Sequence, residues 1–287
     1  MKNVKILKQS QIFFDDVLTE DNSEHLYQHL IYDNEGNMTS ETTFNEDGDV
    51  LSKSKREYDE FGRLIMEMRE ENELETEIFK FRFEGKLLVE ECHEFGELYT
   101  ERAQYTYDEK QRCIERANLD DDDEVMDKKI MIYENDLLTK IENVEDDEAE
   151  VETEFFYDEN GNKIEEIYHT MEGKEITTNY TYENNLLVKT ITYNEYGGIS
   201  QIEENIYDEK KRIIKTITKT HDETATYLFD FNDDDLVYHL RVFNRNDVLL
   251  QEVNRVYENG LLLSTESIVF KPELNRKEVT VMNYVSE

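Results

Sequence analysis

Apolar and polar residues alternate along most of the 287-residue chain, in short runs that end at polar segments. In the clearest run, alternate positions carry the larger side chains: Ile176, Thr178, Tyr180 and Tyr182. Similar runs follow at 187–193, 213–219, 227–231 and 236–242. Alternation rich in Thr, Ile, Val, Tyr and Phe is typical of half-buried antiparallel strands. Since no stretch sustains helical spacing, the pattern predicts an all-β protein.

An aromatic residue, called an anchor below, closes one of these runs about every 25 residues. The anchors are Tyr32, Tyr58, Phe83, Tyr107, Tyr133, Tyr157, Tyr182, Tyr207, Phe231 and Tyr257. Successive anchors lie 24 to 26 residues apart, and Asp, Asn, Glu or Gly commonly follows them. Asx side chains bond the nearby backbone and Gly accepts positive φ, so a turn is expected after each anchor.

A second turn-prone segment lies near the middle of most units, as at 45–48, 93–96 and 194–198. Two turns per unit predict two strands per unit, each filling about 12 residues with its turn. We therefore expect an all-β antiparallel meander of about ten hairpins of about 25 residues, forming one elongated, twisted or coiled sheet. Twist should coil this sheet either into an open spiral or into a closed, barrel-like shell, and the sequence leaves both alternatives open. Residues 1–287 are expected to form one repeat domain, with 1–30 as an N-terminal cap, 31–265 as hairpin repeats and 266–287 as a C-terminal cap strand.

Two units share a longer pattern: residues 58–64 read YDEFGRL and residues 157–164 read YDENGNKI. This pattern resembles the YD repeats of the Rhs type, and the resemblance extends over roughly residues 30–265. Other units depart from it, with Phe at 83 and 231 and with Glu after the anchor at 84, 134, 183 and 258. No stretch corresponds to the toxin domain or protease-like segment of large Rhs proteins. The resemblance implies a strand–turn–strand fold and a link to polymorphic toxins, and it implies no particular activity.

The chain has 70 acidic and 32 basic residues, a net charge of −38. Such a surface repels phosphates, so nucleic acid and anionic membranes are poor partners. A basic protein is the natural complement. An alternative is that the charge keeps a long sheet soluble and prevents its edges from aggregating.

Residues that commonly carry chemistry are sparse and scattered. Cys92 and Cys113 are the only cysteines, and no CxxC motif or paired histidine completes a zinc pattern. The glycines are spaced as turn residues, and no nucleophile elbow is present. We therefore expect a non-enzymatic protein without cofactor or metal. The apolar run 12–14 is too short for a secretory leader, so we expect a cytoplasmic protein.

Three acidic clusters are the candidate protein-binding residues. They are Asp120, Asp121, Asp122, Asp123 and Glu124; Asp146 and Asp147; and Asp233, Asp234 and Asp235. The simpler interpretation is that solvated turns tolerate charge. The functional hypothesis is that they help to capture a cationic protein, as in an immunity protein, a toxin inhibitor or a chaperone of a polymorphic toxin. The alternative hypothesis is a structural or cell-surface module that binds carbohydrate or scaffolds an envelope complex.

Overall fold

The computed structural model describes residues 2–71, 76–96, 98–120, 122–146 and 148–286, which form 22 strands and one short 3₁₀ helix. The elements are β1 (Lys2–Phe14), β2 (Val17–Tyr32), β3 (Met38–Phe44), β4 (Val50–Tyr58), β5 (Leu64–Glu71), β6 (Glu77–Glu84), β7 (Leu87–Phe95), β8 (Tyr99–Tyr107), β9 (Cys113–Leu119), β10 (Val125–Glu134), β11 (Leu137–Glu145), β12 (Glu148–Tyr157), β13 (Lys163–His169), β14 (Glu175–Glu183), β15 (Leu186–Tyr193), β16 (Ile199–Tyr207), β17 (Ile213–Thr220), β18 (Thr224–Phe231), β19 (Val237–Asn244), β20 (Leu249–Glu258), β21 (Leu261–Lys271), η1 (Pro272–Leu274) and β22 (Arg276–Ser286). Sequence neighbours pair antiparallel in one sheet, so the prediction of an all-β antiparallel meander is confirmed.

The chain divides into two compact units. Unit 1 is chiefly Gln28–Phe156, and unit 2 is chiefly Val4–Tyr27 together with Lys174–Glu287. Both are built from the same hairpins. The division into hairpin repeats and terminal caps stays a prediction.

The aromatic anchors fall at the ends of strands, as the sequence predicts. Each is the last or the next-to-last residue of an even-numbered strand from β2 to β20. At every anchor whose pairing is described, the following strand contains a β-bulge, in which two of its residues lie opposite a single residue of the anchor's strand. At Tyr58, for example, Leu64 lies opposite the anchor while Met66 lies opposite Glu57. Bulges bend a strand and increase its local twist, so the repeat also sets a regular bend.

The turns share one hydrogen-bonding pattern, built on an Asp or Asn side chain. After Tyr58, the Asp59 carboxylate accepts the backbone N–H of Phe61 at 2.9 Å and of Arg63 at 3.0 Å. The same two-bond pattern occurs among the described residues at Asp33, Asn45, Asp59, Asp108, Asp120, Asp158, Asn194, Asp208, Asn232 and Asn244. The third residue after the Asx has positive φ, as at Gly62 (76°) and Lys211 (63°). Glycine adopts this conformation without steric cost, whereas lysine does not.

The anchor tyrosines bond to the strand that precedes their own. Tyr107, at the end of β8, donates its hydroxyl hydrogen to the carbonyl oxygen of Leu88, near the start of the paired strand β7, at 2.7 Å. Equivalent bonds of 2.8–3.1 Å come from Tyr58, Tyr133, Tyr207 and Tyr257. Burial raises the pKa of the Tyr107 hydroxyl. These bonds hold the end of each of these even-numbered strands to the start of the odd-numbered strand that precedes it and pairs with it.

Arginines make the opposite link, from one turn forward to the next anchor. The guanidinium of Arg112 lies 4.5 Å from the centroid of the Tyr133 ring and pairs with Asp108 of its own turn at 2.6 Å. Arg63 and Arg212 are placed in the same way over Phe83 and Phe231. A cation over an aromatic face is attracted by the ring quadrupole, so these arginines are engaged in the scaffold.

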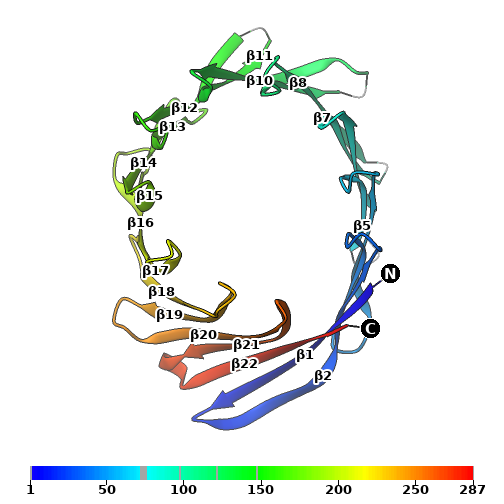
Figure 1. The fold of residues 1–287 in the computed structure, drawn as a ribbon, viewed down its shortest axis with the longest axis vertical. Coiled ribbons are helices and arrows are strands. Elements are labelled where there is room, and N and C mark those ends of the chain that lie inside the picture. Colours follow the sequence, from blue (N-terminus) through cyan, green and yellow to red (C-terminus); the bar gives the residue numbers. More distant parts are fainter. Residues whose placement is uncertain (1, 72–75, 97, 121, 147, 287) are drawn as a thin grey trace. The chain divides into compact units, whose positions relative to one another are not determined.

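The first and last strands pair with each other (Figure 1). β1 and β22 form eleven residue pairs, from Val4 opposite Ser286 to Phe14 opposite Arg276. The expectation of one elongated sheet is therefore wrong, because such a sheet would leave each terminal strand with an unpaired edge. Their pairing gives partners to the backbone N–H and C=O groups on those edges and removes a site for aggregation.

Few side chains are fully removed from water. The buried residues among those described are Ile6, Ala103, Ala117, Leu119, Val242, Val253, Ser54, Glu67, Thr153 and Asn205. The sheet is therefore held mainly by backbone pairing and by contacts between repeats, and its faces remain available to partners. No helix in the described part of the chain is long and apolar enough to cross a bilayer.

Candidate functional site

A pocket of about 580 Å³ lies in unit 1, on strands β6 to β10. Residues opposite one another in antiparallel strands point to the same face, so the register gives two rows of side chains. The middle row is Phe81, Glu91, Ala103, Asn118 and Asp127, and the end row is Phe79, His93 and Glu101. Ala103 is 2% exposed and carries only a methyl group between Glu91 and Asn118. The short side chain leaves room for the hollow.

One wall of the pocket is aromatic. The rings of Phe79 and His93 stack at 4.2 Å with an interplanar angle of 9°, and Tyr99 meets His93 edge-on at 5.8 Å. On β5, the guanidinium carbon of Arg69 lies 4.6 Å from the Phe79 centroid. Phe81, which is half-buried, also lines the pocket and has no ring or cation contact with another described residue.

A hydrogen-bonded network orders the opposite wall. Arg116 donates to Glu91 at 2.9 Å, to Asn118 at 2.7 Å and to the Tyr105 hydroxyl at 3.3 Å. Asn118 donates in turn to Asp127 at 2.7 Å. Burial would lower the pKa of Arg116, but its bonds to Tyr105 and Glu91 outweigh burial and raise it. The Arg116 charge is thus held by Glu91, while the Asp127 carboxylate accepts a bond from the amide of Asn118.

Glu101 is the most accessible carboxylate in the two rows, with its side chain 76% exposed. Among the described residues its nearest basic group is His93, whose Nδ1 lies 3.9 Å away. A carboxylate without a close cation at the edge of an aromatic hollow attracts positive charge. The pocket therefore combines aromatic rings with acidic groups.

Thiol and metal chemistry find no support at this site. Burial, followed by the charge of Glu94, raises the pKa of Cys92, and burial raises the pKa of Cys113. Both effects disfavour the thiolate, which is the reactive form. Within the described ranges, no three His, Cys, Asp or Glu side chains are grouped to hold a metal ion.

A second, smaller hollow of about 240 Å³ lies on β3 to β5 of the same unit. It contains Glu67, which is 5% exposed and is held by Arg56 at 2.9 Å and Arg69 at 2.7 Å. Burial would raise the pKa of Glu67, but the two arginines outweigh it and lower that pKa. The buried charge of this hollow, that of Glu67, is therefore paired within the sheet.

The first predicted cluster lies beside the large pocket, in the turn between β9 and β10. Asp120 lines the pocket and accepts the backbone N–H groups of Asp122 and Glu124, both at 2.9 Å. Asp123 pairs with Arg102. The carboxylates of Asp122 and Glu124 have no hydrogen bond or ion pair with a described residue. The structure therefore assigns Asp120 and Asp123 to the turn and leaves two acidic groups open.

The second cluster lies in the turn between β11 and β12, at the same end of the strands as the first. The Asp146 carboxylate has no bond or ion pair with a described residue, and its φ is 50°. Asp121 and Asp147 lie outside the described residues. Because the strands alternate in direction, the turn that contains Asp146 lies at the same end of the strands as the turn between β9 and β10.

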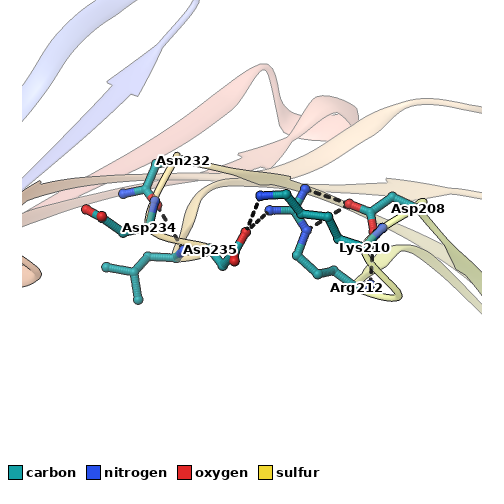
Figure 2. A network of polar contacts seen from close by, with 7 residues as sticks. Asp208, Lys210, Arg212, Asn232, Asp234 and Asp235 are labelled. Carbon is teal, nitrogen blue, oxygen red and sulfur yellow. Dashed lines mark hydrogen bonds and ion pairs between the residues drawn. The ribbon is translucent and has the colours of Figure 1, made fainter.

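The third cluster lies in unit 2, in the anchor turn between β18 and β19, where it serves the scaffold (Figure 2). Asp235 pairs with Lys210 at 3.0 Å and with Arg212, both in the preceding anchor turn. Its pKa is lowered, first by the bond from Lys210. The Asp233 and Asp234 carboxylates have no bond or ion pair with a described residue. One of the three carboxylates, that of Asp235, is therefore engaged in the scaffold.

Sequence reasoning did not identify Phe79, Phe81, His93 or Glu101 as members of one site. The available signal was the run of three phenylalanines at 79, 81 and 83 in a unit that lacks the usual tyrosine anchor. These residues can be grouped into rows only when the register between five strands is known.

No protein-family model matches the chain, and no curated protein matches it. Similar solved structures include a Photorhabdus luminescens Tc holotoxin pore, with a TM-score of 0.44 and 11% identity over 100% of this chain and 18% of that one. A TcdB2–TccC3–Cdc42 complex gives a TM-score of 0.30 at 12% identity, over 93% of this chain and 21% of that one. A porin-like protein from Bacteroides uniformis gives 0.33 at 10% identity, covering 99% and 96%. The chain spans about a fifth of the Tc chains.

Proposed function

We propose that this protein is a non-enzymatic, acidic binding protein that captures a cationic protein partner in the cytoplasm. The supporting observation is the group of carboxylates at one end of the pocket strands. Glu101, Asp122 and Glu124 lie there without a close Lys or Arg partner among the described residues. We therefore expect these carboxylates to attract a positively charged partner.

The distribution of basic residues supports the same function. The chain has fewer than half as many basic as acidic residues. Several of its arginines, including Arg63, Arg112 and Arg212, are engaged by anchor turns and rings. The charge that remains accessible is therefore mainly negative, which would steer a basic protein toward the surface and increase its rate of association.

The sharper form of the proposal is an immunity-like inhibitor or a chaperone of a toxin. It treats the hairpins as YD repeats of the Rhs type, on the strength of the motifs at 58–64 and 157–164. In this form the acidic end of unit 1 covers the basic working surface of the toxin. Binding would occlude that surface without any chemical step.

The test is affinity capture from the lysate of the source cells, followed by purification of any retained protein and measurement of its toxic activity. We expect one basic protein to bind with defined stoichiometry at about 150 mM salt, to dissociate as salt rises, and to lose its activity when bound. The triple variant Glu101→Gln, Asp122→Asn and Glu124→Gln should bind it more weakly.

The matched control is Glu60→Gln, Glu159→Gln and Glu209→Gln, which removes the same charge from exposed anchor-turn positions. It should retain most of the affinity. Recovery of no basic protein even at low salt would overturn the proposal. Recovery of the protein only from the envelope fraction would overturn the cytoplasmic assignment.

A further inference from the structure

We propose that the unit 1 pocket receives an arginine side chain of the captured partner, stacked on Phe81 and held by Glu101. This inference rests on the proposed function and specifies the partner chemistry at its site. It combines the Phe81 ring, the Glu101 carboxylate and the hollow above Ala103, all of which line the pocket.

The fold itself shows how this chemistry is arranged. Arg212 lies 4.5 Å from the centroid of the Phe231 ring while it pairs with Asp208 at 2.6 Å. The same ring-plus-carboxylate arrangement recurs at Arg63 and Arg112. In the pocket, the ring and the carboxylate are present and no described arginine occupies Phe81. An incoming guanidinium would complete an arrangement that the scaffold already uses.

The charge at the pocket agrees with a cationic guest. Arg116 is paired with Glu91, and Arg102 is paired with Asp123. Among the described residues, the nearest basic group to the Glu101 carboxylate is a His93 nitrogen at 3.9 Å, and the Asp127 carboxylate accepts a bond from the amide of Asn118. The charge in the pocket that is not balanced by a close Lys or Arg among the described residues is therefore negative.

Arginine fits better than lysine for geometric reasons. A guanidinium is planar, stacks on an aromatic face and donates to a carboxylate in fixed directions, whereas an ammonium is a compact, strongly hydrated charge. The volume of about 580 Å³ lies within the range of pockets that bury a small ligand. It can therefore hold the side chain together with part of the adjoining residues.

The experiment uses the full chain and three short peptides, Ac-Gly-Xaa-Leu-Gly-NH₂, in which Xaa is arginine, lysine or citrulline. Citrulline keeps the shape of arginine but has no charge. Binding is measured by calorimetry, and the site is located by NMR chemical-shift changes. We expect the arginine peptide to bind at least about fivefold more tightly than the lysine peptide, with shift changes centred on β6 to β10 and no measurable citrulline binding.

Two variants test the named contacts. Glu101→Gln and Phe81→Leu should each weaken arginine binding about fivefold or more, while the matched charge control Glu209→Gln should leave it unchanged. Circular dichroism establishes that each variant is folded. Equal binding of arginine and citrulline peptides, or equal effects of Glu101→Gln and Glu209→Gln, would overturn the inference.

The two proposals fail separately. If the basic partner is captured but Phe81→Leu binds it as tightly as the unaltered protein, the arginine site is wrong and the proposed function stands. If no basic partner is captured, the proposed function is wrong whatever the peptides show.

Discussion

The hydroxyl bonds of the anchor tyrosines give a direct test of how the two strands of each repeat are held together. Replacing Tyr107 by Phe removes a single 2.7 Å bond to the Leu88 carbonyl and keeps the ring in place. A net hydrogen bond contributes about 1 kcal/mol to the free energy of unfolding, within a range of roughly 0.5–1.5 kcal/mol. We therefore expect Tyr107→Phe to be destabilised by about 1 kcal/mol.

The repetition of the bond makes the test stronger. The four other bonds, from Tyr58, Tyr133, Tyr207 and Tyr257, measure 2.8–3.1 Å and lie in different repeats. Effects at separated sites add approximately, so the variant with all five substitutions should lose about 5 kcal/mol, a large part of the stability of an ordinary domain.

Urea denaturation followed by far-UV circular dichroism is the suitable assay, because the chain has no tryptophan and the substitutions alter its tyrosine fluorescence. The control is Tyr238→Phe, whose side chain is on the exposed part of β19 and whose hydroxyl has no bond to a described residue. Single variants within about 0.3 kcal/mol of the unaltered protein, or equal losses at Tyr107 and Tyr238, would refute the reasoning.

The same tyrosines predict a loss of stability in alkali. Burial raises the pKa of Tyr58, Tyr107, Tyr133 and Tyr207 in the folded protein above the usual value of 10.0. As pH rises above about 10, the unfolded chain loses these protons first, so the free energy of unfolding falls. The variant with all five substitutions should show a smaller decline between pH 9 and pH 11 than the unaltered protein, and an equal decline would contradict the assignment.

Three further predictions concern the scaffold. Glu67→Gln should cost about 3 kcal/mol because it leaves Arg56 and Arg69 without their buried partner, and Glu70→Gln, on the exposed part of β5, should cost little in the same urea assay. Lys211→Gly should stabilise the protein by up to about 1 kcal/mol, and Gly161→Ala should destabilise it by at least as much, because both positions have positive φ. A lower melting temperature for Lys211→Gly than for Gly161→Ala would reject this reasoning. The pKa of Asp208 is lowered from 3.8, first by the backbone N–H of Arg212 and then by its side chain. The contribution of the Asp208 carboxylate to the free energy of unfolding is therefore present above pH 3.8 and is lost as pH falls through the folded-state pKa. Asp208→Asn should reduce the difference between the free energies of unfolding at pH 7 and pH 3, and an unchanged difference would count against this assignment.

Local features of the fold were predictable from the sequence, and long-range ones were not. The anchors and turns follow from residue types within a few positions, as at Tyr58 and Asp59, because alternation and Asx chemistry act locally. The bulge opposite each anchor carries no residue signal, since different residues such as Thr39, Ile65 and Val89 occupy the extra position. The pairing of β1 with β22 joins opposite ends of the chain and has no local signature.

The candidate site was predicted only in part, for a similar reason. Asp120, Asp122 and Glu124 were selected by charge; Asp120 lines the pocket, Asp122 and Glu124 lie in the same turn, and their role in protein binding stays a prediction. Charge alone could not show that Asp123 and Asp235 face arginines about one repeat earlier. The place of Phe81 in the pocket and the hollow over Ala103 depend on which residues stand opposite one another across five strands.

The pairing of β1 with β22 also has a consequence for synthesis. The β22 residues that pair with β1 leave the ribosome roughly 270 residues after it, whereas β2, its other partner strand, follows directly. At about 5–20 residues per second, β1 waits roughly 15 to 55 s before β22 exists. Throughout this interval one side of β1 is an open template for other nascent chains. Translation speed and chaperone supply should therefore affect the yield of this protein more than that of a protein whose first strand pairs only with nearby segments.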